Sequence, residues 1–150
     1  MSATGPWQNG TCDRPSLDTD VLIDLALDRE PHAEPAAGLL DALEQRPGTA
    51  FVAWHSLSNF YYLVAPSRGK HQARDFLLDL TRFVQVAPTT TESLVYAGGL
   101  DLRDFEDAMQ VAAAASCRAT LIATRNLRDY ARSPIRAAPP QAVLAELLGT

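Results

Sequence analysis

A chain of 150 residues has the size of one compact domain and is too short for two domains that each bury a core of their own. Its hydrophobic fraction of 47% and charged fraction of 21% exclude an intrinsically disordered chain, and no run approaches the ~20 apolar residues of a membrane span. The formal net charge of −5 argues mildly against a nucleic-acid partner.

The amino-terminal segment predicts little structure. Residues 1–16 are polar and rich in Gly, Pro and Ser, so we expect a flexible tail followed by a single domain over 17–150. This start has neither the basic residues nor the apolar stretch of a secretion signal, which leads us to expect a cytoplasmic protein. Cys12 and Cys117 lie far apart and lack metal-ligand spacing, so neither a zinc site nor a disulfide is expected.

The rest of the chain alternates between short apolar runs and amphipathic stretches. In chain order, a weak strand precedes Asp18, helices are expected over 21–27 and 33–45, a strand over 49–53, helices over 55–64 and 69–80, a strand over 83–86, helices over 91–96 and 102–116, a strand over 119–123, and a last helix after Pro140. Strands separated by helices predict a parallel sheet with helices on both faces, which is the α/β class. In such sheets the ligand site lies past the carboxyl ends of the strands, where the strand order switches.

Two polar clusters fall at expected strand ends. Asp18 and Asp20, in LDTDVLID, follow the first strand, and Asn126 and Asp129, in ATRNLRDY, follow the strand over 119–123. Each cluster alone also has an ordinary interpretation, because Asp and Asn commonly cap helices and turns.

A third cluster lies on a helix. In DLRDFEDAMQ, Asp104 and Asp107 are three residues apart and share a helix face, whereas Glu106 points about 100° away and is not expected to be a metal ligand. A solvated helix face is the ordinary alternative. Carboxylates from three separate segments on one sheet edge would repel one another unless a cation neutralised them, and Mg²⁺ accepts such oxygen ligands.

The conjunction and chain order of these motifs resemble a PIN domain, and within that superfamily most closely the VapC-type toxin nucleases and related bacterial proteins. The resemblance rests on LDTDVLIDL, SNFYYLV, DFEDAMQVAAA and ATRNLRDY, and it covers nearly the whole chain from Leu17 onward. It implies a three-layer α/β/α fold around a central, mostly parallel sheet of four or five strands.

The resemblance also implies a site and an activity. Mg²⁺ or Mn²⁺ would be bound by Asp18, Asp107 and Asp129, with Asp104 as a further catalytic carboxylate. The expected supporting residues around this site are Asp20, Asn59, Thr124 and Asn126. The implied function is a metal-dependent endoribonuclease, the toxin of a toxin–antitoxin pair, with RNA, an antitoxin protein and a second copy of the chain as partners.

One departure from the family pattern bears on activity. The family usually carries a Glu on the helix that holds SNFYYLV, and the matching position here is Asn59. An amide oxygen can still coordinate a cation, but one negative charge is lost and metal affinity should fall. The alternative function is therefore a catalytically weakened PIN scaffold that binds RNA or a protein partner without cleavage.

Two further interpretations stay open. The arginine-rich carboxy-terminal stretch provides Arg125, Arg128 and Arg132 as candidate RNA contacts, with a solvated charged face as the equal alternative. DTDVL also resembles the nucleophile motif of haloacid-dehalogenase-type phosphatases, but that chemistry needs a lysine after a later strand, and Lys70 is the only lysine. His55 and His71 are expected to be structural or surface residues.

Overall fold

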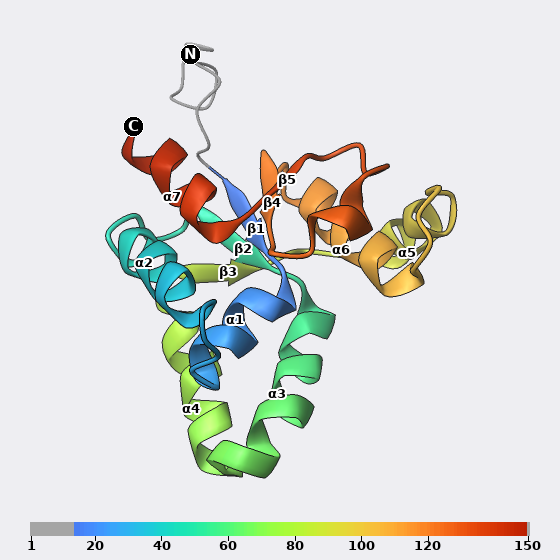
Figure 1. Ribbon diagram of the computed structural model, residues 1–150. Coiled ribbons are helices and arrows are strands. Elements are labelled where there is room, and N and C mark those ends of the chain that lie inside the picture. Colours follow the sequence, from blue (N-terminus) through green and yellow to red (C-terminus); the bar gives the residue numbers. More distant parts are fainter. Residues whose placement is uncertain (1–13, 150) are drawn as a thin grey trace.

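The computed structural model describes residues 14–149, and its centre is a five-stranded parallel sheet (Figure 1). In the spatial order β3-β2-β1-β4-β5, the strands are β1 Pro15–Leu17, β2 Ala50–Val52, β3 Val84–Val86, β4 Leu121–Ala123 and β5 Ala137–Ala138. The helices are α1 Thr19–Ala26, α2 Ala33–Glu44, α3 Trp54–Arg68, α4 Lys70–Leu80, α5 Thr91–Gly98, α6 Phe105–Ser116, the 3-10 helix η2 Leu127–Tyr130, and α7 Pro140–Leu148. This confirms the predicted α/β class and the sheet of four or five strands.

The sheet separates two helical layers because the side chains of its strands alternate between its faces. Leu17, Val52 and Ala123 pack into the large core formed with α1, α2, α3, α4 and α7. Phe51 and Ile122 point the other way, onto the alanine-rich face of α6. Figure 1 shows α5 and α6 on the opposite side of the sheet from α1 and α3. The result is the three-layer α/β/α arrangement that the sequence predicts.

The central strand β1 begins inside the segment expected to be a tail. Pro15 and Ser16 form its first two residues and pair with Leu121 and Ile122 of β4, whereas residues 1–13, with Cys12, lie outside the described residues. Proline is compatible with the first position of a strand, where it costs the fewest hydrogen bonds. All three residues of β1 are buried and pair with β2 and β4. Pairing with these strands therefore stabilises a strand that the sequence of β1 predicts only weakly.

Two helix ends differ from expectation. α6 begins at Phe105, later than expected, because the side chain of Asp104 caps it. α3 continues through Pro66 to Arg68 and ends at Gly69, whose φ of +96° favours glycine. Within the described part of the chain, no helix combines the length and apolar character needed to cross a membrane.

The order of the strands fixes where a site can form. From β1 the chain builds β2 and β3 on one side, and then β4 and β5 on the other. The loops leaving β1 and its two neighbours therefore diverge at one edge, which is the switch point where ligands bind in open parallel sheets. Asp18 follows β1, Trp54 opens α3 just after β2, and Thr124 follows β4.

Candidate metal centre

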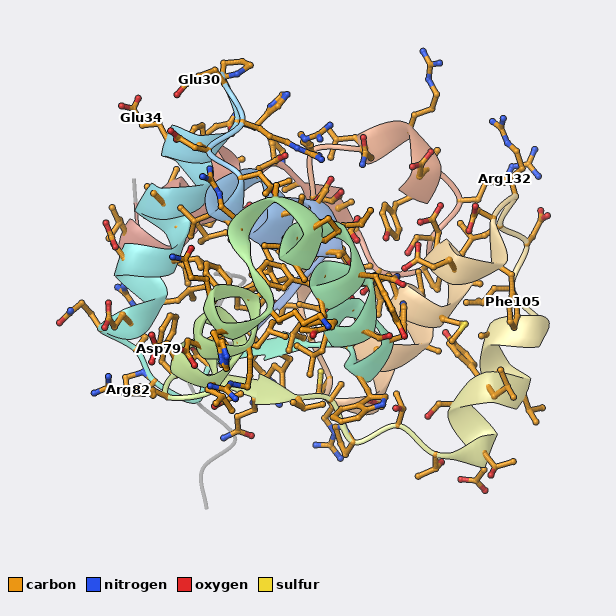
Figure 2. The ribbon with its side chains drawn as sticks, turned by 90° about the horizontal axis from the view of Figure 1, so that it is seen from below. Glu30, Glu34, Asp79, Arg82, Phe105 and Arg132 are labelled. Carbon is orange, nitrogen blue, oxygen red and sulfur yellow. The ribbon has the colours of Figure 1, made fainter. Side chains whose placement is uncertain are left out.

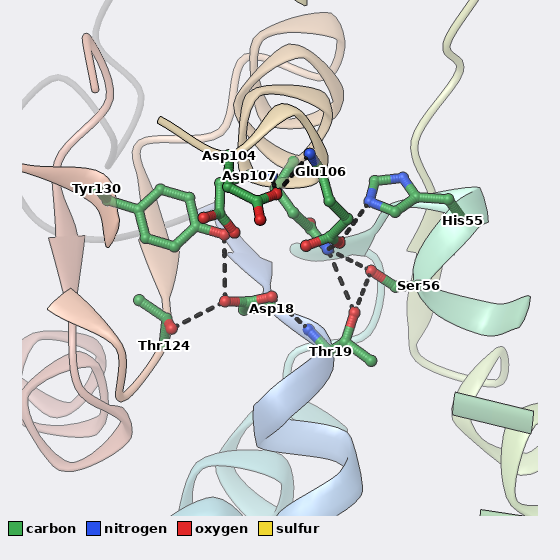
Figure 3. A network of polar contacts seen from close by, with 10 residues as sticks. Asp18, Thr19, His55, Ser56, Asp104, Glu106, Asp107, Thr124 and Tyr130 are labelled. Carbon is green, nitrogen blue, oxygen red and sulfur yellow. Dashed lines mark hydrogen bonds and ion pairs between the residues drawn. The ribbon is translucent and has the colours of Figure 1, made fainter. Parts of the chain in front are cut away.

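Asp18 lies at the centre of this edge and is 7% exposed. It caps α1, because its Oδ1 accepts a hydrogen bond from the backbone N–H of Thr19 at 2.7 Å. Its Oδ2 accepts from the hydroxyls of Thr124 at 2.9 Å and Tyr130 at 3.1 Å (Figure 3). Burial raises the pKa of Asp18 and the charge of Glu106 raises it further, against the lowering effect of these hydrogen bonds.

Asp20 faces the loop after β4. Its Oδ2 accepts from the Thr124 hydroxyl at 3.1 Å, the Arg125 backbone N–H at 3.2 Å and the Asn126 amide at 2.8 Å. Burial and the neighbouring Asp18 raise the pKa of Asp20 to about 7. Thr124 contacts both carboxylates but has a single hydroxyl proton, so it can donate to only one of them at a time.

The first turn of α6 carries the remaining carboxylates. Asp104 accepts from the backbone N–H groups of Glu106 at 2.7 Å and Asp107 at 3.3 Å. One oxygen from each of these three side chains can be chosen so that all lie within 4.8 Å of one another. The carboxylate of Glu106 therefore lies within reach of the other two, although Glu106 and Asp107 are set about 100° apart around the helix.

Asp107 connects the separate clusters electrostatically. Its pKa is raised to about 7, first by burial and then by the charges of Glu106, Asp104, Asp129 and Asp18. Asp107 and Asp129 line the same cleft, and the charge of Asp18, which follows β1, also acts on Asp107, whereas the metal-binding roles of all three stay predictions. In Figure 3 the carboxylates of Asp104, Glu106 and Asp107 lie above Asp18, between Tyr130 and His55.

The carboxylates of Asp104 and Asp107 open onto a cleft of about 710 Å³, whose lining does not include Glu106. Its walls are formed by the loop before α6, the start of α6, and η2 with the residues after it: Asp101, Leu102, Arg103, Asp104, Asp107, Arg128, Asp129, Ala131 and Arg132. Asp18 lies behind this wall rather than on it, and is exposed only slightly. The volume of this cleft lies within the range of about 300–1,000 Å³ that is usual for small-ligand sites.

The donor set fits a hard divalent cation. All the candidate ligand atoms are carboxylate oxygens, which Mg²⁺ and Mn²⁺ prefer over nitrogen or sulfur. Burial and then repulsion from neighbouring acids raise the pKa of Asp107, and a cation would remove the repulsive part. The carboxylates close enough to share a cation are those of Asp104, Glu106 and Asp107, and the predicted participation of Asp18 and Asp129 stays a prediction.

A buried polar network lies directly behind these acids and was not predicted. Ser56 and Gln110 are 0% and 1% exposed, and the Gln110 amide lies 2.5 Å from the Ser56 hydroxyl. The hydroxyl of Thr19 donates to Ser56 at 2.8 Å, and the His55 ring nitrogen Nε2 lies 2.9 Å from Glu106 (Figure 3). The network therefore ties α1, α3 and α6 together under the site.

The predicted arginines occupy different positions. The guanidinium of Arg125 pairs with the buried Asp24 at 2.6 and 3.2 Å, and its predicted RNA contact stays a prediction. Arg128 and Arg132 do lie on the cleft, and Figure 2 shows Arg132 pointing away from the body of the molecule. Arg103, also on the cleft, was missed.

Two residues of the α3–α4 hairpin remain to be placed. Asn59 is half-buried one turn after His55 and Ser56, and among residues 14–149 none forms a hydrogen bond with its side chain, so its supporting role stays a prediction. Lys70 is exposed at the far end of α3, whose 15 residues span about 22 Å at 1.5 Å per residue (Figure 1). This separation from Asp18 argues against the phosphatase interpretation.

Comparison with known proteins agrees with this geometry. The PIN domain family matches residues 15–128, so the chain belongs to the PIN domain family. Among curated proteins, none gives a significant sequence match.

Two solved structures resemble the fold at low sequence identity. One is VapBC2 from Rickettsia felis bound to a DNA fragment from its promoter, with 18% identity and a TM-score of 0.63 over 83% of this chain and 97% of that one. The other is VapC20 from Mycobacterium tuberculosis, a toxin that cleaves the sarcin-ricin loop, with 17% identity and a TM-score of 0.58 over 72% and 86% of the two chains. At these identities the likeness establishes a shared fold.

Proposed function

We propose that the chain is a Mg²⁺- or Mn²⁺-dependent endoribonuclease. The observation that carries the proposal is the group of carboxylates at the start of α6: oxygens of Asp104, Glu106 and Asp107 lie within 4.8 Å of one another, beside a cleft that Asp129 also lines. The pKa of Asp107 is raised to about 7 by burial and then by neighbouring acids, and strongly perturbed pKa values cluster at functional sites. Membership of the PIN domain family also supports a nuclease function.

In this proposal each residue has a distinct task. A bound divalent ion would supply an activated water and neutralise charge that develops on the scissile phosphate. Asp18, Asp107 and Asp129 bind the ion, and Asp104 adds charge while it caps α6. Thr124 and Tyr130 orient Asp18 through hydrogen bonds, and Asp20 and Asn126 fix the loop after β4.

Arginines on the cleft provide the complementary surface for RNA. Arg128 and Arg132 take this role, and Arg103 joins them. Guanidinium groups bind phosphate through paired hydrogen bonds, so a basic rim beside an acidic centre can hold a strand across the metal.

The biological setting follows from the family. We propose a cytoplasmic toxin of a toxin–antitoxin pair that binds an antitoxin protein and forms a homodimer. The structural neighbours support this setting, since one was determined as VapBC2 on promoter DNA and the other is described as a toxin that cleaves the sarcin-ricin loop.

The decisive experiment is metal-dependent cleavage. The purified chain is incubated with a mixed RNA pool and Mg²⁺ or Mn²⁺, beside an Asp107→Asn variant as the matched control. Cleavage by the unmodified protein alone, abolished by EDTA and restored by Mn²⁺, supports the proposal. Equal cleavage by both proteins points to a contaminating nuclease and overturns it.

The second candidate is a PIN scaffold that binds RNA or a protein partner without cutting. The observation that favours it is that α3, from Trp54 to Arg68, contains no Asp or Glu, so this helix adds no carboxylate to the centre. RNA retention on a filter with no cleavage at any Mn²⁺ concentration would favour this candidate.

A further inference from the structure

The Glu106 side chain points toward His55 and Gln110, although it could turn into solvent instead. Its side chain is 41% exposed, and a glutamate in the first turn of a helix can rotate freely into solvent. Instead its Oε2 lies 2.9 Å from Nε2 of His55 and 3.4 Å from Nε2 of Gln110. A carboxylate can only accept, so both nitrogens act as donors to it.

The orientation of the Gln110 side-chain amide leaves one buried polar atom without a hydrogen bond among residues 14–149. The residue is 1% exposed, and this atom is its Oε1. The other end of the amide, Nε2, faces the hydroxyls of Ser56 at 2.5 Å and Thr19 at 3.3 Å as well as Glu106. Leaving a buried acceptor unpaired is unfavourable, and the orientation that does so presents a donor to the Glu106 carboxylate.

This position is unfavourable for Glu106 unless something positive lies beside it. Oxygens of Asp104, Glu106 and Asp107 lie within 4.8 Å of one another. Glu106 is therefore held beside two other carboxylates at the start of α6.

We propose that Glu106 is a further ligand of the metal ion at this group of carboxylates, positioned by His55 and Gln110. The inference rests on the proposed metal-dependent function and adds a residue to its site. His55 and Gln110 act through Glu106 and are positioning residues: they hold its carboxylate toward the acids that it would otherwise avoid. In this way α3, which lacks a carboxylate, still contributes to the centre through His55.

The test is calorimetric titration of Mn²⁺ alone into the purified full chain and its variants. Glu106→Gln removes the charge, and Glu106→Asp keeps the charge but withdraws it by one methylene. We expect each to weaken Mn²⁺ binding by roughly tenfold to a hundredfold, and His55→Leu by roughly tenfold. Glu92→Gln is the matched control, since Glu92 occupies the same second position of α5, and its affinity should equal that of the unmodified chain.

The outcomes separate the inference from the proposed function. Unchanged affinity in Glu106→Gln overturns the inference, and so does full affinity in Glu106→Asp, which would show that Glu106 acts only as a distant charge. Unchanged affinity in His55→Leu overturns the positioning role. If the unmodified chain binds no Mn²⁺, or Asp107→Asn binds it equally well, the proposed function itself fails. Thermal melting of every variant without metal verifies that each is folded.

Discussion

Asp107→Asn should stabilise the metal-free protein while it removes metal-dependent activity. In the folded chain the pKa of Asp107 rises from 3.8 to about 7, through burial and the charges of Glu106, Asp104, Asp129 and Asp18. Such a rise corresponds to an upper limit of ~4 kcal/mol against the ionised folded state. Because Asp107 is only partly buried, solvent screening reduces the expected gain in unfolding free energy to about 1–2 kcal/mol.

The pH dependence of this gain has a defined sign. A carboxyl whose folded pKa lies above its unfolded pKa contributes stability that is fully present below pH ~4 and is lost as pH rises through about 7. Asparagine does not titrate, so the variant keeps what the unmodified protein loses. The two proteins should have nearly equal stability at pH 4, and the variant should be more stable at pH 8 in EDTA.

Thermal melting across this pH range is the assay, with and without Mg²⁺. For a domain of this size, 1 kcal/mol shifts the melting temperature by about 2–4 °C. Mg²⁺ should stabilise the unmodified protein more than the variant, because only the former keeps its full ligand set. Asp41→Asn, an exposed position on α2, is the control and should show neither effect. A variant that is several kcal/mol less stable in EDTA would show Asp107 to be a structural residue.

Three further substitutions test other parts of the site. Asp24→Asn breaks the ion pair with Arg125 and should lower the free energy of unfolding by ~2–3 kcal/mol in urea titrations, since a partly buried charge loses its partner; an unchanged midpoint would contradict this. Tyr130→Phe removes the hydroxyl that donates to Asp18 and should weaken calorimetric Mn²⁺ binding roughly tenfold, whereas equal affinity would show that Thr124 alone orients this acid. Asn59→Glu should strengthen Mn²⁺ binding if Asn59 reaches the cleft, and unchanged or weaker binding would exclude that placement.

Elements with strong local patterns were predictable. The apolar stripes of α2 and α6 gave nearly correct helices, and the run before Thr124 gave β4. β5 was missed because Ala137–Ala138 has no β-forming side chain, and its strand conformation comes from pairing with β4. Short strands of this kind depend on tertiary contacts that a single sequence does not display.

The acids of the site were easier to predict than the residues that hold them. Asp18, Asp107 and Asp129 stand in dense polar motifs, whereas Gln110 looks like an ordinary member of an alanine-rich helix. One signal was available: Gln110 lies four residues after Glu106, and it falls within the run that packs on the sheet, where a polar side chain needs a buried partner. That partner, Ser56, lies 54 residues away, and only the fold reveals it.

The electrostatics of the cleft explain why the acids can gather there before any cation binds. α1 and α6 both begin at the site, capped by Asp18 and Asp104, and α3 begins beside it with His55. The amino ends of helices carry partial positive charge, and each stabilises a nearby carboxylate by about 0.3–1 kcal/mol. This contribution is of the same order as the ~1–2 kcal/mol by which burial and like charges oppose ionisation of the partly exposed Asp107. The helix ends therefore offset much of the repulsion among these acids, and a divalent cation would remove the repulsion that remains.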